Sequence, residues 1–175
     1  MSHVDDIRTF NAFPHHIDQQ RPFGLRIHVD EETAAAEAGT ICVLPRTEGP
    51  PLHVHTAQDE IFTVISGELF AQVGDRSYTL TAGQQVSFPK NTPHTYANRS
   101  DQVCVFAYRL TPGGDFTRMM RELETLGRAG KITRLGELRT MLHLAGVISR
   151  FGHHVRSVRP PHVVMRLLGF FSRFA

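Results

Sequence analysis

The 175-residue sequence lacks tryptophan, has only two cysteines, and contains no apolar run approaching the roughly 20 residues of a membrane-spanning helix. Its first residues, MSHVDDIRTFNAF, include no apolar core like that of a secretory signal. Cys42 and Cys104 each stand alone among apolar neighbours, which favours buried free thiols over a disulfide or a metal site. Together these absences predict a cytoplasmic, reducing location.

Acidic residues are nearly absent from the last part of the chain. Residues 128–175 hold 9 Lys and Arg but 1 Asp or Glu, whereas residues 1–127 hold 10 and 16. The chain therefore combines an acidic body with a basic tail. With 41% hydrophobic and 21% charged residues, its composition is that of a globular protein, and its length suits one domain with an appended subdomain.

From Gly24 to Leu110 the sequence alternates between short apolar segments and the turn-forming residues Gly, Pro, Asn and Asp. The segments that we predict as strands are GLRIHVD, TICVLP, EIFTVIS, ELFAQVG, RSYTLTA, QQVSFPK, HTYANRS and QVCVFAYRL. The dipeptide Gly74-Asp75 predicts a hairpin turn between two of them. Regularly spaced short strands without helical patterns between them predict a mainly β fold, an antiparallel sandwich or barrel.

A helical pattern replaces the strand pattern after Pro112-Gly113-Gly114. The segments DFTRMMRELETLGRAG and ITRLGELRTMLHLAGVISRFG place apolar residues three and four positions apart, and Pro160-Pro161 is compatible with the start of a further helix. We therefore expect an N-terminal arm over residues 1–23, a β domain over residues 24–111 and an α-helical C-terminal extension over residues 112–175.

Side chains able to bind a metal gather in two short stretches, GPPLHVHTAQDEIFTVISGEL and GQQVSFPKNTPHTYAN. In a strand, His53 and His55 project to the same side, and Glu60 begins the next strand opposite them. His94 follows a turn at the head of a later strand. Three imidazoles and a carboxylate suit Fe, Mn, Ni, Co, Cu or Zn, and the ligand types alone do not choose among these ions.

These stretches resemble the two motifs of the cupin superfamily. The first motif ends H-x-H, three or four residues, E, six residues, G, and the second runs G, five residues, P-x-G, two residues, H, three residues, N. The matching residues are His53, His55, Glu60 and Gly67, then Gly83, Pro89, His94 and Asn98. Two positions depart from the pattern: Gly49 stands four rather than six residues before His53, and Asn91 replaces a glycine. Asn tolerates the left-handed backbone that a glycine supplies in a turn.

The resemblance covers about residues 24–110 and implies a single jelly-roll β-barrel with a metal inside one mouth. By the same resemblance His53, His55, Glu60 and His94 are the metal ligands. Asp59 is a second candidate carboxylate, but the six-residue gap to Gly67 selects Glu60. Alternation along the strand then places Phe62 and Val64 on the side of Glu60.

The same stretches look like small single-cupin proteins similar to quercetin dioxygenases. This resemblance implies a metal-dependent dioxygenase in which Glu60 also has a catalytic role, accepting the proton of a substrate hydroxyl group. A mostly apolar pocket suits a small, aromatic or otherwise poorly soluble molecule. The alternatives are a non-redox, metal-dependent isomerase or lyase and a non-catalytic cupin that binds a small ligand, because one fold hosts many activities.

The remaining histidines and the basic tail carry weaker signals. We expect the adjacent pairs His15-His16 and His153-His154 to diverge into solvent, and we weigh His28 as a residue facing the interior. The last helix has a wide apolar face that must be covered. We favour packing within the chain or in a homodimer over contact with an anionic membrane surface, and we expect no nucleic acid partner.

Overall fold

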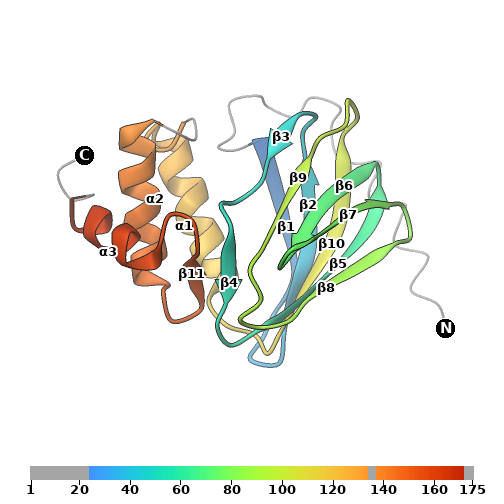
Figure 1. Ribbon diagram of the computed structural model, residues 1–175, viewed down its shortest axis with the longest axis horizontal. Coiled ribbons are helices and arrows are strands. Elements are labelled where there is room, and N and C mark those ends of the chain that lie inside the picture. The colour runs from blue at the N-terminus through green and yellow to red at the C-terminus, as the bar shows by residue number, and fades with distance from the viewer. Residues whose placement is uncertain (1–23, 134–136, 172–175) are drawn as a thin grey trace.

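The computed structural model describes residues 24–133 and 137–171, which form two antiparallel sheets with helices along one side (Figure 1). One sheet has the strand order β1 (Leu25–Glu32), β2 (Glu37–Val43), β10 (Cys104–Thr111), β5 (Asp59–Ser66) and β8 (Gln85–Phe88). The other has the order β11 (Val155–Ser157), β4 (His53–His55), β9 (His94–Asn98), β6 (Glu68–Val73) and β7 (Arg76–Thr81), with β3 (Thr47–Glu48) also paired to β9. The expected N-terminal arm lies outside the described residues.

The eight predicted strands are all present, and two features of their turns follow from the sequence. Gly74 has a φ of 57° in the turn that joins β6 to β7, where Val73 pairs with Arg76. Asn91 has a φ of 61°, so it adopts the left-handed conformation expected of the glycine that it replaces. The Asn91 N–H also donates a 2.7 Å hydrogen bond to the carbonyl oxygen of His55, which ties this turn to the first metal-binding stretch.

The sheets do not close into the barrel that the sequence led us to expect. In the described residues no strand pair joins one sheet to the other, and β4 pairs with β9 at one position. The core between the sheets continues instead into the helices, since Phe116, Met119 and Val147 belong to the same buried cluster as Phe62 and Phe106. Helical side chains therefore occupy the side where a barrel would close.

The C-terminal extension contains α1 (Phe116–Arg128), α2 (Leu138–Arg150) and α3 (His162–Phe171), together with the unexpected short strand β11. The start of α1 is fixed by Glu37, a fully buried carboxylate on β2. Its oxygens accept hydrogen bonds from the backbone N–H groups of Gly114, Phe116 and Thr117 at 3.0, 3.2 and 2.8 Å. A carboxylate satisfies the free N–H groups of a helix N-terminus, so Glu37 joins the extension to the sheets.

The last helix lies against α2 through only one of its sides. Met165 is buried, and a side chain added at Gly169 would lie 2.8 Å from the carbonyl oxygen of Ala145. No part of the chain that the structure describes covers the opposite side, where Leu167 and Phe170 are more than half exposed. Among the described residues no helix is long and apolar enough to cross a membrane.

Candidate metal centre

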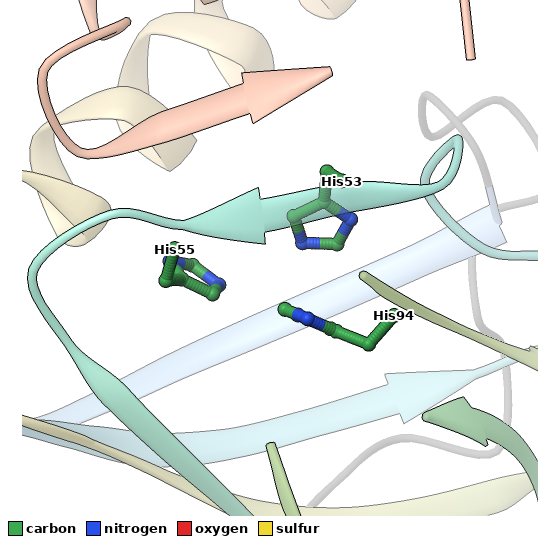
Figure 2. Close-up of side chains that lie close together, drawn as sticks. All are labelled: His53, His55 and His94. Atoms are coloured by element: carbon green, nitrogen blue, oxygen red, sulfur yellow. The ribbon is translucent and has the colours of Figure 1, made fainter. Parts of the chain in front are cut away.

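The four predicted ligands come together between the sheets. His53 and His55 lie on β4, His94 begins β9, and the rings converge as Figure 2 shows. Ring nitrogens of the three histidines lie within 4.8 Å of one another. Glu60, on β5, completes the group, because its Oε2 atom lies 3.3 Å from Nε2 of His94 and 3.6 Å from Nε2 of His55. The neighbouring Asp59 points outward and accepts a 2.8 Å hydrogen bond from the N–H of Lys90.

Backbone carbonyl groups fix which nitrogen of two rings carries the proton. Nδ1 of His53 lies 2.9 Å from the carbonyl oxygen of Pro51, and Nδ1 of His94 lies 2.9 Å from that of Thr92. A carbonyl oxygen only accepts, so in the neutral rings both Nδ1 atoms donate and both Nε2 atoms keep a lone pair. This arrangement of the outer hydrogen bonds is the one that metal-ligating histidines use.

The electrostatics at His53 and Glu60 favour the protonation states that a cation needs. The pKa of His53 lies well below its usual value because the ring is withdrawn from water and faces His94 and His55. Burial alone would raise the pKa of the Glu60 carboxyl group, but the adjacent His55 and His94 rings outweigh it and hold that pKa below its usual value. A neutral imidazole beside an ionised carboxylate is a ligand pair for a divalent ion.

Two independent observations indicate that the three histidines and Glu60 suit a metal ion. Among the described residues the buried Nε2 of His94 and both ring nitrogens of His55 have no hydrogen-bond partner, a costly state that coordination would relieve for one nitrogen of each ring. Ligand atoms about 2.0–2.2 Å from an octahedral or tetrahedral ion stand about 2.8–3.6 Å from their nearest neighbours. The separation of 3.3 Å between Glu60 and His94 falls within that range, and the 3.6 Å between Glu60 and His55 lies at its upper end.

A cavity of about 120 Å³ opens beside the cluster. Its lining includes His53, His55 and Glu60 at one end, together with Tyr96 and Ser157 as the other polar side chains. The remaining wall is aliphatic or aromatic, and the sheets and the extension both contribute to it. Its side chains from the extension are Phe116, Met119, Met120, Leu123, Leu144, Val147, Ile148 and Val155.

Among the residues that line the cavity, Glu60 is the one acid and there is no Lys or Arg. Burial, with a further contribution from Glu60, raises the pKa of the Tyr96 hydroxyl group. Tyr96 therefore stays protonated at neutral pH and does not serve as a base. The cavity thus combines a metal-binding end with a wall suited to an apolar molecule.

Three expectations about individual residues need correction or extension. His28 faces outward rather than inward and pairs with Asp30 at 3.3 Å, with 65% of its side chain exposed. His153 and His154 do not diverge, since the turn after α2 brings their ring centroids to 4.3 Å from each other. The contribution of the extension to the cavity, and the role of Glu37, were missed because each depends on contacts between segments distant in sequence.

Comparison with known proteins finds a similarity in the β part of the chain. Residues 39–111 match the family model described as "Cupin domain". Over these residues, less than half of its length, the chain is similar to cupin domains. Its two antiparallel sheets are those of the double-stranded β-helix fold, and the helices of the extension lie beyond the matched residues. No curated protein matches the chain.

Solved structures show the same fold at low sequence identity. KdgF from Halomonas sp. is 18% identical with a TM-score of 0.50, and the match covers 54% of this chain and 84% of KdgF. A Klebsiella pneumoniae protein with a double-stranded β-helix domain is 25% identical with a TM-score of 0.48, covering 51% of this chain and 78% of that one. A cupin-superfamily sugar phosphate isomerase from Silicibacter pomeroyi is 20% identical with a TM-score of 0.47, covering 50% and 59%.

Proposed function

We propose that the chain is a metal-dependent dioxygenase that acts on a small, largely apolar organic molecule, with an aromatic hydroxyl compound as the favoured class. The observation that carries this proposal is the cavity, whose largely apolar lining includes His53, His55 and Glu60 from the cluster of possible metal ligands. His53, His55, Glu60 and His94 would hold the ion. When bound, Fe, Mn, Ni, Co or Cu supplies redox chemistry and Lewis acidity, whereas Zn supplies Lewis acidity alone.

The chain's own residues would position the substrate and accept its proton. Phe62, Phe116 and Met119 line the cavity and would hold an apolar ring while excluding water from the polar end. A hydroxyl group directed toward that end meets Glu60, the one carboxylate in the lining. Glu60 would accept the hydroxyl proton on a carboxylate oxygen, which leaves a substrate anion beside the cation site.

A phosphorylated sugar suits this cavity poorly. The name of the Silicibacter pomeroyi protein specifies such a substrate, but a phosphate group calls for Arg, Lys or a cluster of backbone N–H groups. The lining of this cavity contains no Lys or Arg and few polar side chains of any kind. The proposed substrate is therefore apolar, and the non-redox isomerase or lyase is the less favoured alternative.

The test is to purify the chain without a His-tag, determine its metals by elemental analysis, and measure O₂ consumption with flavonols and catechols. We expect a redox-active ion near one equivalent and substrate-dependent O₂ uptake. Glu60→Gln keeps the side-chain size but removes the proton acceptor, so we expect O₂ uptake to fall at least about 100-fold. Zinc without O₂ uptake would replace the dioxygenase with non-redox chemistry, and a chain that binds no metal would leave a non-catalytic binding protein.

A further inference from the structure

A second group of metal-binding side chains lies outside the cavity, where the extension meets the sheets. Asp115 precedes α1, while His153 and His154 occupy the turn between α2 and β11. Nε2 of His153 lies 3.1 Å, and Nε2 of His154 3.3 Å, from the same oxygen of Asp115, Oδ2. The three ligand atoms all lie within 4.8 Å of one another.

We propose that Asp115, His153 and His154 form a second divalent-metal site, suited to Zn²⁺. Neighbouring ligand atoms of a tetrahedral zinc ion, at about 2.0–2.1 Å from it, are about 3.3 Å apart, which agrees with both nitrogen-to-oxygen distances. Two imidazoles and one carboxylate are common zinc ligands. The His153 side chain is 58% exposed, so water has access to the fourth position.

The surroundings orient these ligands. Nη1 of Arg118 lies 3.2 Å from Oδ1 of Asp115, the carboxylate oxygen that faces away from the histidines, and its guanidinium lies 5.0 Å from the centroid of the Phe151 ring. This contact turns Oδ2 toward the two rings, as outer partners do for carboxylates that bind metals. Among the described residues the buried Nδ1 of His154 has no hydrogen-bond partner, and Nε2 faces Asp115, so an ion at Nε2 would replace that contact with coordination bonds.

An ion at this position would join three parts of the chain. Thr56, which follows His55, donates its backbone N–H to the carbonyl oxygen of His154 at 2.8 Å and its hydroxyl group to that of His153 at 2.6 Å. Residues after the turn pair directly with β4, with Val155 opposite His55. The ion would therefore hold α1 and the β11 turn against the strand that carries His53 and His55. This role is structural and does not depend on the proposed dioxygenase activity.

The test titrates Zn²⁺ into the metal-free, untagged full chain and counts bound zinc by elemental analysis. Residues 1–23 carry three further histidines, so the result is read as the difference between variants. We expect the double variant His153→Ala, His154→Ala and the single variant Asp115→Asn each to bind one zinc fewer than the unaltered chain. His94→Ala, in the cavity cluster, should lose a different zinc, and combining it with Asp115→Asn should remove both.

The matched control is His28→Ala, which removes another exposed histidine that pairs with an aspartate. It should leave the zinc count unchanged, and circular dichroism establishes that every variant is folded. Equal zinc counts for the unaltered chain and the folded His153→Ala, His154→Ala variant would overturn the proposal. The same is true if His28→Ala lowers the count as much, since any surface histidine would then account for the binding.

The uncovered side of α3 supports a second, independent inference. Its exposed apolar residues are Val163, Val164, Leu167, Phe170 and Phe171, with exposed fractions of 64, 39, 65, 60 and 54%. At about 100° per residue they fall within an arc of about 120°, and Arg166 stands at its edge. The inner side of α3 already contacts α2, so these residues have no partner in the single chain among the described elements.

The positive charge of the C-terminal segment indicates which kind of surface binds the exposed apolar side of α3. From residue 138 to the end the sequence has six Arg and no Asp, Glu or Lys, and Arg156, Arg159 and Arg166 are exposed. A two-fold contact between copies through α3 would bring together two sets of the same side chains, and neither α2 nor α3 has a carboxylate to pair with Arg166. We infer that α3 binds an anionic membrane surface, with its apolar face among the acyl chains and Arg166 at the headgroups.

To test this inference, the full chain is sedimented with two kinds of vesicle. One is phosphatidylcholine alone, and the other contains about 30% of the anionic lipid phosphatidylglycerol. We expect binding to the anionic vesicles, weakened by salt, and a loss of at least about tenfold in the double variant Leu167→Ser, Phe170→Ser. Leu138→Ser is the matched control, because Leu138 is 72% exposed but lies on α2. Absence of vesicle binding would overturn the inference, as would a dimer that Leu167→Ser, Phe170→Ser abolishes.

Discussion

His53 and His94 form the one Cα pair between β4 and β9, and their ring centroids lie 4.3 Å apart. This pairing joins the two stretches that carry the predicted ligands, although 40 residues separate them along the chain. Each ring is also anchored through Nδ1 to a carbonyl group two residues before it, Pro51 or Thr92. The two rings are therefore positioned by the backbone before any ion binds.

Removing either histidine should therefore remove the metal without unfolding the domain. We expect His53→Ala and His94→Ala to lower metal affinity about 100-fold or more, since each deletes a direct ligand. Elemental analysis after dialysis measures the bound metal, and thermal unfolding reports on the fold. His28→Ala serves as the control, because His28 lies outside the cluster. Full occupancy in both His53→Ala and His94→Ala would refute the ligand assignment.

The strands, and the convergence of the four predicted ligands, could be predicted because they follow from residue patterns within short segments. Alternation along β5 places Glu60, Phe62 and Val64 on the buried side, as expected. The motif spacing then identified which polar residues share the interior. The open arrangement of the sheets did not follow from this pattern, because strand pairing across long loops depends on the whole core.

The extension was predicted as helices but not as a wall of the cavity. Helical periodicity shows that Phe116, Met119 and Leu123 share a face, yet it does not show what that face covers. The turn that brings His153 and His154 to Asp115 was equally hidden, because adjacent side chains diverge only in regular elements. The division into an arm over residues 1–23, a β domain over residues 24–111 and an extension over residues 112–175 stays a prediction, as do the homodimer and the cytoplasmic location.

Glu37 should be among the most important residues for the attachment of the extension. Glu37→Ala would leave three backbone N–H groups at the start of α1 without their acceptor, at a cost of about 3 kcal/mol or more. Glu31→Ala removes an exposed partner of Arg109 and should cost about 0.5 kcal/mol. Urea unfolding of both variants measures the difference, and equal losses would contradict the proposed role of Glu37.

The two glycines Gly67 and Gly74 separate backbone strain from steric conflict. Both have a positive φ, of 78° and 57°. A Cβ atom added at Gly67 would lie 2.3 Å from the carbonyl oxygen of Val103, whereas a Cβ atom added at Gly74 would have no atom of the described residues within 4 Å beyond its chain neighbours. We expect Gly74→Ala to cost about 1 kcal/mol and Gly67→Ala about 3 kcal/mol or more. Denaturant midpoints for the two variants provide the comparison, and similar values would mean that the backbone at Gly67 relaxes easily.

The buried ring of His143 predicts how stability depends on pH. Burial, with a smaller contribution from Lys131 and Arg139, lowers the pKa of His143 in the folded chain below the value of about 6.5 in the unfolded chain. Above that pH both states are neutral and the group has no effect. As the pH falls below about 6.5, the unfolded chain binds the proton first, so the free energy of unfolding decreases.

The variant His143→Gln isolates this contribution from the other histidines. Between pH 7 and pH 5 we expect the unaltered chain to lose more stability than the variant, from the difference in proton uptake. Urea unfolding at about half-unit intervals of pH measures both slopes, with metal removed so that proton competition at the cavity cluster is the same in the two proteins. Parallel slopes would show that His143 binds its proton equally well in the folded state, which requires water to reach its Nε2 atom, an atom without a hydrogen-bond partner in the structure.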